Sequence, residues 1–346
     1  GDWSSDVCSS DLEQVIVYEV TGRVIPPGGI PLNVGAVVSN VATVLNIYDA
    51  TIGKSVIDKI ITVTGEVNNP SVLSVPIGIS ISKCIKAAGG LNIKDYCVIM
   101  GGPMMGRILN SDEVEKRSIT KTDGGIIVLP ADHYIKERKS ISVQHIINQT
   151  KSSCIQCSYC TQMCPRYLLG HPLRPHKIMR AISMSLDHSE EIFKEALICS
   201  ECGICEMYAC PMGISPRQVN IMIKNELRQK GVKFNTTLNI IPDEQRDGRQ
   251  VPVSRLVQRL NLGKYKDIKF DDKAIEVKVN IVTIPLKQHI GKFATAIVAV
   301  GDEVNKGQLI GEVKREDVGA NIHASISGKV TNVSDCIIIE SSEVIL

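Results

Sequence analysis

The chain of 346 residues is poor in aromatic side chains and has no charge excess and no long apolar run. Aromatic residues make up 4% of the sequence, and Trp3 is the only tryptophan. This scarcity favours small β-rich modules built on Val and Ile. The formal net charge is +2, so no general attraction to nucleic acid is expected. The apolar stretch of residues 34–47 is interrupted by Ser39 and Asn40 and is too short for a transmembrane helix.

Residues 1–12 lack an initiator Met and also the basic start and apolar core of a signal peptide. We expect them to be a non-native segment joined to a chain that begins within a domain. The cysteines do not follow the pattern of a secreted disulfide framework, so reduced thiols and a cytoplasmic protein are expected. Four scattered cysteines are expected to act as small buried hydrophobes; these are Cys8, Cys84, Cys97 and Cys336.

The other eight of the twelve cysteines lie in two similar runs, CIQCSYCTQMCP at residues 154–165 and CSECGICEMYACP at residues 199–211. Three cysteines at two-residue gaps place three thiolates on one short loop. A fourth cysteine followed by proline binds the other cluster in two-cluster ferredoxins. The spacing therefore predicts two 4Fe–4S clusters with crossed ligation. Cluster 1 would be held by Cys154, Cys157, Cys160 and Cys210, and cluster 2 by Cys199, Cys202, Cys205 and Cys164.

Two structural zinc sites are the alternative interpretation of these cysteines. Zinc usually takes paired ligands, two plus two, and a triple followed by Cys-Pro fits that pattern less well. Three histidines between the runs, His171, His176 and His188, could tune a cluster or carry protons. Surface or hydrogen-bonded histidines are the expected interpretation, because eight cysteines already satisfy two clusters.

Apolar stripes with helical spacing surround the two cysteine runs. One helix is predicted from Pro175 to Leu186, and another follows a cap at Ser189. A third is predicted after residues 215–218, which have the pattern of a capping box with proline at the first helical position, and it stops at Gly231. The segment 217–273 carries 13 Lys and Arg against 7 Asp and Glu. We interpret it as a solvated linker face, with a docking face for an acidic redox partner as the alternative.

Elsewhere the patterns predict β-rich modules. Residues 13–25 alternate like a strand, and residues 34–46 have the spacing of a buried helix. We interpret the glycine-rich residues 101–106 as a tight turn, with a loop that lets a ligand approach the backbone closely as the alternative. Short strands separated by glycine turns fill residues 274–346. The other expected elements are a hairpin at residues 61–67 and 72–75, a helix at 80–88 that Gly89 and Gly90 stop, and strands at 98–100 and 124–130.

Residues 13–346 resemble one superfamily. VTGRVIPPGGIPLNVGAVVSNVATV is similar to the end of the flavin-binding domain of the complex I 51-kDa subunit and RnfC proteins. ITVTGEVNNP and GGPMMGRIL resemble their SLBB β-grasp domain. IPLKQHIGKFATAIVAVGDEVNKGQLIGEV with ANIHASISGKV resembles the RnfC barrel-sandwich domain. RnfC carries this barrel before its flavin domain. Here it follows the clusters, an order that resembles the PduS-type cobalamin reductases, as does SECGICEMYACPMGISPRQVN with four residues between Cys205 and Cys210.

The resemblance implies a multidomain α+β protein. The expected segments are a flavin-domain remnant at 13–58, an SLBB β-grasp domain at 59–135, an α-helical dicluster ferredoxin domain at 136–235, a linker at 236–273 and an all-β barrel-sandwich hybrid at 274–346. The main glycine-rich FMN and NADH loops of the family lie upstream of this chain. No FMN-binding, NADH-binding or catalytic residue is therefore assigned, and NADH oxidation by this chain alone is left open.

The implied function is an NADH-dependent oxidoreductase that passes electrons through FMN and two 4Fe–4S clusters to cobalamin. The implied setting is a propanediol-utilisation microcompartment in the cytoplasm, with cobalamin or a cobalamin adenosyltransferase as partner and the shell as a further contact. The alternatives are an RnfC-like electron-input subunit of a membrane ion-translocating complex and a non-enzymatic zinc-binding scaffold.

Overall fold

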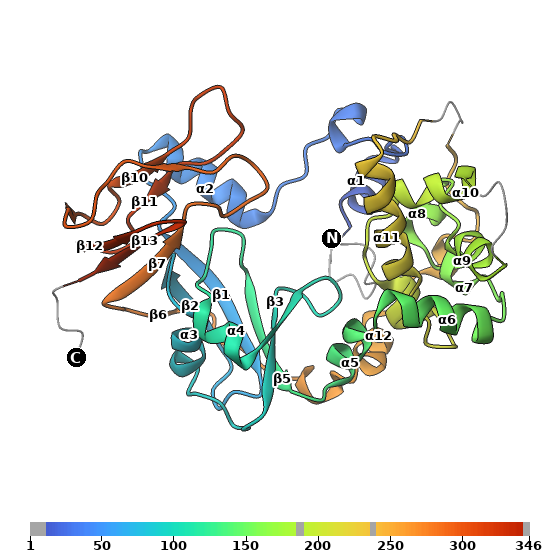
Figure 1. The fold of residues 1–346 in the computed structure, drawn as a ribbon, viewed down its shortest axis with the longest axis horizontal. Coiled ribbons are helices and arrows are strands. Elements are labelled where there is room, and N and C mark those ends of the chain that lie inside the picture. The colour runs from blue at the N-terminus through green and yellow to red at the C-terminus, as the bar shows by residue number, and fades with distance from the viewer. Residues whose placement is uncertain (1–11, 185–189, 236–239, 342–346) are drawn as a thin grey trace. The chain divides into compact units, whose positions relative to one another are not determined.

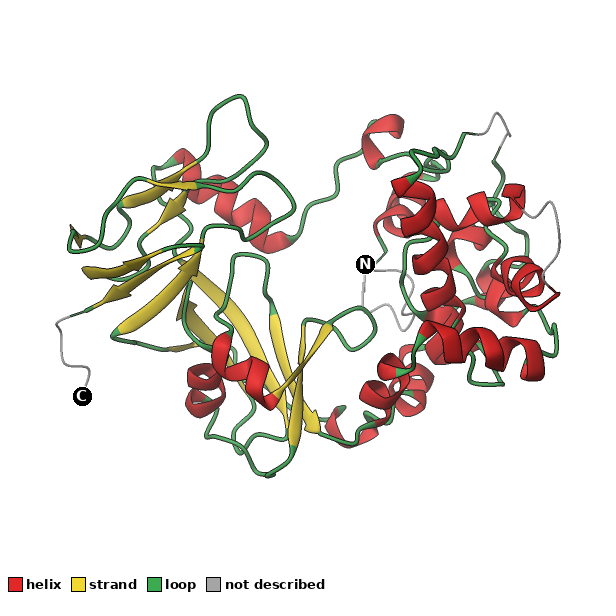
Figure 2. Cartoon of the chain, in the orientation of Figure 1, coloured by secondary structure: helices red, strands yellow, loops and turns green. Residues whose placement is uncertain are grey.

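The computed structural model describes residues 12–184, 190–235 and 240–341 and divides into two compact units. Gly1–Ser39 and Glu137–Lys266 belong to the first, which we call the cysteine unit. Asn40–Lys136 and Asp267–Leu346 belong to the second, which we call the sheet unit. Figure 2 shows that helices prevail in the cysteine unit and strands in the sheet unit.

Short helices surround the two cysteine runs (Figure 1). They pack through one core that includes Ile146, Ile178, Val219 and Ile223. The elements are α6 (Val143–Ser153), α7 (Tyr159–Gln162), α8 (Pro165–Leu168), α9 (Pro175–Met184), α10 (Glu190–Lys194), η3 (Glu195–Ile198), the π-helical turn η4 (Cys205–Ala209) and α11 (Pro216–Gln229). The segment predicted as a linker contributes η5 (Asp247–Arg249), α12 (Val253–Arg259) and η6 (Gly263–Tyr265), all within the cysteine unit.

The predicted helix starts at Pro175 and Pro216 are confirmed, because each proline is the first residue of its helix. Helix α11 ends just before Gly231, which adopts the left-handed conformation at φ 70°. The predicted capping box is wrong. Ser215 makes no cap hydrogen bond, and its hydroxyl instead accepts a hydrogen bond from Arg138 Nη2 at 3.0 Å. The predicted Leu186 and Ser189 lie outside the described residues.

The strand predicted for residues 13–25 is wrong, because this segment begins as helix α1 (Glu13–Thr21). Its valines suit a strand locally, but β-propensity is a weak preference that packing overrides. Val15 and Val17 are buried within the cysteine unit, and Gly22 ends the helix in the left-handed region at φ 68°. A short turn, η2 (Pro31–Val34), follows.

The buried helix predicted for residues 34–46 is also wrong in position and in burial. Helix α2 (Val41–Thr51) starts later, where the Asn40 side chain accepts a hydrogen bond from the backbone N–H of Ala42 at 2.9 Å. Helix α2 has no buried residue, and Val41 is 85% exposed. Helical spacing of apolar residues thus identified a helix without identifying a surface that covers it.

The sheet unit is built on a six-stranded sheet with the strand order β4-β3-β5-β1-β2-β6. Strands β1 and β2 form the predicted hairpin, and β5 pairs in parallel with β1. The strands are β1 (Asp58–Gly65), β2 (Ser71–Pro76), β3 (Tyr96–Met100), β4 (Arg107–Asn110), β5 (Gly125–Pro130) and β6 (Ile275–Glu276). Helix α3 (Ile81–Ala87) confirms the predicted helix, and α4 (Ser111–Lys116) follows β4; α5 (Tyr134–Ser140) leads into the cysteine unit.

The C-terminal residues share one core with this sheet. The short strands predicted from residue 274 onward begin with β6, which pairs in parallel with β2, and β7 (Ile281–Pro285). Val63, Leu73, Ile284 and Ile339 belong to the same buried cluster. Two small sheets complete the unit, β11 (Ile322–His323)-β10 (Leu309–Glu312)-β8 (Thr295–Ala296) and β7-β13 (Cys336–Glu340)-β12 (Gly328–Val333)-β9 (Glu303–Val304).

Close backbone contacts join the SLBB-like and barrel-like parts of the sheet unit. The backbone N–H of Thr283 donates to Gly78 O at 2.8 Å, and the fully buried hydroxyl of Ser325 donates to Ile77 O at 2.5 Å. Gly78 has φ 96°, and a Cβ there would lie 2.7 Å from Ile284 Cγ1. Glycine is therefore required where the two parts meet.

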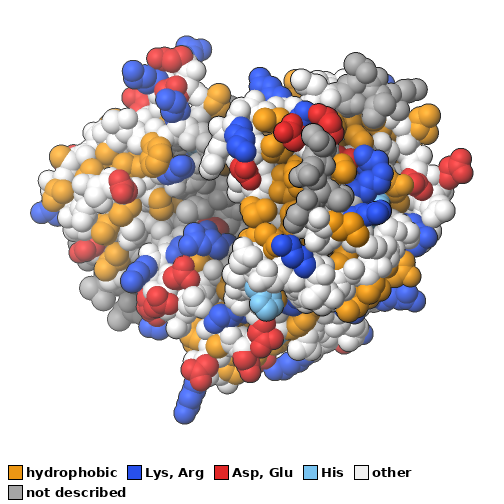
Figure 3. All heavy atoms as spheres, turned by 45° about the vertical axis from the view of Figure 1, so that its right-hand side comes forward, with side chains coloured by type: hydrophobic (Ala, Val, Ile, Leu, Met, Phe, Trp, Pro, Cys, Tyr) orange, Lys and Arg blue, Asp and Glu red, His pale blue; other side chains and the backbone are white. Residues whose placement is uncertain are grey.

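The exposed surface is mixed in charge. On the face drawn in Figure 3, Lys and Arg side chains are interspersed with Asp and Glu and with hydrophobic side chains. Within the described ranges of the chain, no helix is long and apolar enough to cross a membrane.

Candidate metal centre

The eight cysteines of the two runs line two separate cavities in the cysteine unit. Each cavity is lined by three cysteines of one run and by the Cys-Pro cysteine of the other run. The first cavity is lined by Cys154, Cys157, Cys160 and Cys210, and the second by Cys164, Cys199, Cys202 and Cys205. The structure thus brings the cysteines together in the same two sets that the spacing predicted.

Both cysteine triples have the same backbone conformation. Gln156 and Glu201 occupy equivalent positions and have φ values of 55° and 60°, while Ser158 and Gly203 follow two residues later at 62° and 86°. A side chain other than glycine costs about 1–2 kcal/mol in this left-handed region. Such strain persists where the surroundings impose it and is concentrated at functional sites. Here the strained residues lie between the cysteines, where the backbone turns so that three thiols face one cavity.

The four-residue gap between Cys205 and Cys210 is accommodated by a π-helical turn. Residues Cys205–Ala209 form η4, and the chain becomes extended again at Cys210. A π-turn holds one more residue than an α-turn and is frequent at functional sites. The extra residue relative to the three-residue gap is taken up inside this turn, and Cys210 still reaches the first cavity.

Several N–H groups point at the cysteine sulfurs. Gln156 Nε2 lies 3.2 Å from Cys154 Sγ, and the backbone N–H of Ile214 lies 3.3 Å from Cys210 Sγ. In the second set, Cys199 Sγ accepts from the backbone N–H of Glu201 at 3.4 Å and from Asn220 Nδ2 at 3.6 Å. Hydrogen bonds to sulfur stabilise the charged form of a thiolate and tune the potential of a cluster bound by it.

Burial opposes ionisation of these thiols in the absence of a cation. Burial, with smaller contributions from the neighbouring Cys210, Cys157 and Cys154, raises the pKa of the Cys160 thiol to about 12. Burial likewise raises the pKa of Cys164, Cys202 and Cys205. Metal coordination deprotonates a thiol outright, so each set has the chemistry of a site that is completed by a cationic metal centre.

Cationic side chains surround the second set. Arg217 donates from Nη1 to Glu206 Oε1 at 3.1 Å and from Nε to Glu201 O at 2.7 Å. Lys224 Nζ donates to Cys199 O at 2.7 Å and to Glu201 Oε1 at 2.6 Å. These bonds anchor the second cysteine loop to α11. The positive charges of Arg217 and Lys224 offset the negative charge of nearby thiolates.

The described histidines between the runs are hydrogen-bonded, as expected. His176 lines the first cavity, and its Nδ1 lies 2.7 Å from Thr161 Oγ1. His171 is buried, and its Nε2 lies 2.9 Å from Ile25 O. Burial, with a smaller contribution from the charge of Arg166, lowers the pKa of His171 to about 4. His188 lies outside the described residues.

The scattered cysteines that the structure describes belong to the sheet unit and do not line the two cavities. Cys84 and Cys97 are buried in the sheet unit, as expected for small hydrophobes, whereas Cys336 is only half-buried and Cys8 lies outside the described residues. Burial raises the pKa of Cys84 to about 12.

Considering the described residues alone, no three His, Cys, Asp or Glu side chains are grouped as ligands of a single metal ion.

Sequence reasoning missed two side chains next to the first cavity. Arg255 and Arg259 lie on α12, inside the segment interpreted as a solvated linker. Arg259 Nη2 donates to Cys210 O at 3.2 Å. The basic excess of residues 217–273 was the available signal, but only the packing of α12 on η4 places Arg259 beside Cys210.

Three family models match the chain. They are a 4Fe-4S dicluster domain over residues 153–215, an SLBB domain over residues 60–108 and the RnfC barrel sandwich hybrid domain over residues 264–345. With the two four-cysteine cavities, these modules define an iron–sulfur electron-transfer protein that carries a barrel domain of the RnfC type.

Among curated proteins, the chain is 40% identical to cobalamin reductase PduS of Salmonella typhimurium, over 95% of this chain and 72% of that protein. It is 38% identical to cobalamin reductase PduS of Citrobacter freundii over the same shares. A component of the ion-translocating oxidoreductase complex of Buchnera aphidicola is more distant, at 28% identity over 75% of this chain and 52% of that protein. The chain belongs to the PduS cobalamin reductase family.

Proposed function

We propose that this chain relays electrons through two 4Fe–4S clusters to cobalamin, as a cobalamin reductase. The observation that supports the proposal most directly is the pair of cavities, each lined by four cysteines from both runs. Cys154, Cys157, Cys160 and Cys210 would hold the first cluster, and Cys164, Cys199, Cys202 and Cys205 the second.

The residues around the cysteines suit this role. A bound 4Fe–4S cluster supplies one-electron chemistry. The protein supplies thiolate ligands, N–H groups directed at Cys154, Cys199 and Cys210, and a buried setting that limits contact with water. Lys224 and Arg217 hold the loop of the second set in place through hydrogen bonds to its backbone and to Glu201.

The remaining parts of the electron path rest on family membership. NADH and FMN are proposed as the electron source, bound by residues outside the two cysteine sets. Cobalamin is the proposed acceptor, either free or delivered with a cobalamin adenosyltransferase. A propanediol-utilisation microcompartment, with contact to its shell, is the proposed setting.

Metal and sulfide analysis of anaerobically purified protein tests the cluster assignment. Two clusters require about eight iron and about eight sulfide per chain and a brown colour that dithionite bleaches. A colourless protein with about two zinc ions would overturn the assignment in favour of zinc sites.

Paired cysteine substitutions test which cysteines share a cluster. The variant Cys154→Ser/Cys210→Ser removes two ligands from one proposed set, so it is expected to keep about four iron ions. The variant Cys199→Ser/Cys210→Ser removes one ligand from each set and is expected to lose nearly all iron. If the two iron contents are reversed, each run holds its own cluster and the crossed assignment is wrong.

Electron transfer to cobalamin is tested with the chain itself. The cluster-loaded protein is reduced with dithionite, desalted anaerobically and mixed with hydroxocobalamin. The expected result is the cob(II)alamin spectrum together with recovery of the oxidised cluster absorption. Clusters that stay reduced in the presence of hydroxocobalamin would contradict the proposed acceptor.

A further inference from the structure

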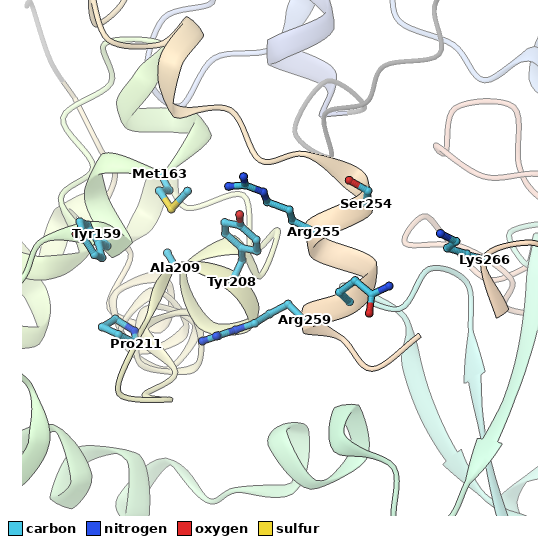
Figure 4. A pocket seen from close by; sticks show the side chains of 10 residues that line it. Tyr159, Met163, Tyr208, Ala209, Pro211, Ser254, Arg255, Arg259 and Lys266 are labelled. Carbon is cyan, nitrogen blue, oxygen red and sulfur yellow. The ribbon is translucent and has the colours of Figure 1, made fainter. Parts of the chain in front are cut away.

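A cavity of about 760 Å³ opens beside the first cysteine set, and we call it the α12 cavity (Figure 4). Tyr159, Tyr208 and Pro211 line it from the cysteine runs, and Arg255 and Arg259 line it from α12. In Figure 4, both arginine side chains extend from α12 toward Tyr208 and Pro211. All of its lining residues belong to the cysteine unit.

The α12 cavity adjoins the ligands proposed for the first cluster. Tyr159 lies between Cys157 and Cys160 in the sequence, and Pro211 follows Cys210 directly. Arg259 also donates to Cys210 O at 3.2 Å, which ties α12 to the same loop. A molecule bound in this cavity would therefore contact Tyr159 and Pro211, which lie within two residues of three of the four cysteines in the set.

The charge of the lining favours an anion. Arg255, Arg259 and Lys266 contribute three positive charges, and the lining has no Asp or Glu. Within the part of the chain that the structure describes, none of these three side chains has an ion-pair partner. Near the second set, by contrast, Arg217 and Lys224 are each paired with a glutamate. The planar guanidinium suits phosphate oxygens, which it can bind through two parallel hydrogen bonds.

The other lining groups favour a conjugated ring. Tyr159 and Tyr208 present aromatic surfaces, and Met163 adds a polarisable thioether. A volume of about 760 Å³ is within the range of cavities that bind cofactor-sized molecules. The combination of unpaired cations with aromatic surfaces matches a ligand that carries both a phosphate and a conjugated ring.

We propose that the α12 cavity binds a phosphate-bearing, conjugated redox molecule and is the place where electrons enter or leave the first cluster. The inference rests on the proposed function, because it requires a cluster at the first cysteine set. Flavin mononucleotide and cobalamin both carry a phosphate and a conjugated ring and share this chemistry. The exchange forms no bond: one electron leaves the donor as one electron arrives at the acceptor.

Equilibrium binding tests the α12 cavity independently of turnover. FMN and hydroxocobalamin are titrated separately into the cluster-loaded chain by calorimetry at low ionic strength. The test variant is Arg255→Glu, and the matched control is Arg228→Glu, because Arg228 is also an exposed helical arginine of the cysteine unit but lies outside the cavity. The charge reversal at Arg255 is expected to weaken binding of one ligand by about tenfold or more, with no change in the control.

The ligand whose affinity falls in Arg255→Glu shows whether the α12 cavity binds FMN or cobalamin. The proposal is overturned if neither ligand binds the wild-type chain, if Arg255→Glu binds as tightly as wild type, or if Arg228→Glu loses the same affinity. Iron analysis of the same samples separates this inference from the proposed function. If Arg255→Glu protein holds about eight iron ions and binds both ligands as tightly as wild type, only the proposal for the α12 cavity is refuted. If the wild-type chain cannot be loaded with iron, the proposed cluster relay is refuted.

Discussion

Lowering the pH from 7.5 to 5.5 is expected to destabilise the cysteine unit through His171. The carbonyl of Ile25 can only accept a hydrogen bond, so Nε2 of His171 carries the proton. Nδ1 is buried and has no hydrogen-bond partner among the described residues. Protonation would place a second N–H, and a positive charge, in a buried position near Arg166. The folded protein therefore resists a proton that the unfolded chain accepts readily.

The pKa values determine the sign and the size of this effect. The His171 pKa is about 4 in the folded protein and 6.5 for the unperturbed side chain. Between these values the unfolded chain binds more protons, so stability is lost as the pH falls from about 6.5 toward 4. The linkage relation then lowers the free energy of unfolding by about 1.3 kcal/mol between pH 7.5 and pH 5.5.

Urea denaturation at the two pH values and constant ionic strength measures this loss. The test variant is His171→Gln, whose side-chain N–H can still reach Ile25 O but does not titrate. It is expected to lose about 1.3 kcal/mol less than wild type over this pH interval. The matched control is His145→Gln, because His145 is exposed on α6, and it should follow the wild-type curve. Equal pH dependence in wild type and His171→Gln would refute the reasoning.

Two further substitutions test packing and charge pairing by urea denaturation. Gly78→Ala is expected to lower the free energy of unfolding by about 2–4 kcal/mol, because the new Cβ adds a clash with Ile284 to the strain of the left-handed backbone. The control Gly90→Ala, at φ 78° with open space around it, should lower it by only about 1–2 kcal/mol. Equal losses in the two variants would contradict the clash. Arg217→Met is expected to cost about 3 kcal/mol, because it leaves buried Glu206 without its ion-pair partner. Adding Glu206→Gln should restore much of that loss, and a double variant less stable than the single one would refute the pairing.

Local sequence signals correctly predicted several helix starts and one hairpin. Pro175 and Pro216 mark helix starts because proline suits the first helical turn, where no backbone N–H is needed. The hairpin of β1 and β2 follows alternating residues around Asn69 and Pro70. In each case the signal and its consequence lie within a few residues of each other.

The errors occurred where distant residues decide the conformation. Residues Glu13–Thr21 form a helix because Val15 and Val17 are buried within the cysteine unit, and α2 is exposed because no described part of the chain buries it. The capping box failed because the Ser215 hydroxyl is occupied by Arg138, 77 residues away in the sequence. Propensity describes a segment in isolation and contains no information on such partners.

The sequence by itself predicted the donor atoms and the crossed grouping, because eight cysteines at these spacings favour two sets of four thiols, and the same two sets line the two cavities. Only the tertiary structure decided what surrounds them. It placed Arg259 of α12 beside Cys210, and it took up the extra residue after Cys205 in a π-turn. Ligand spacing is a local property of the chain, whereas the charge and shape of the surroundings come from segments that meet only when the protein folds.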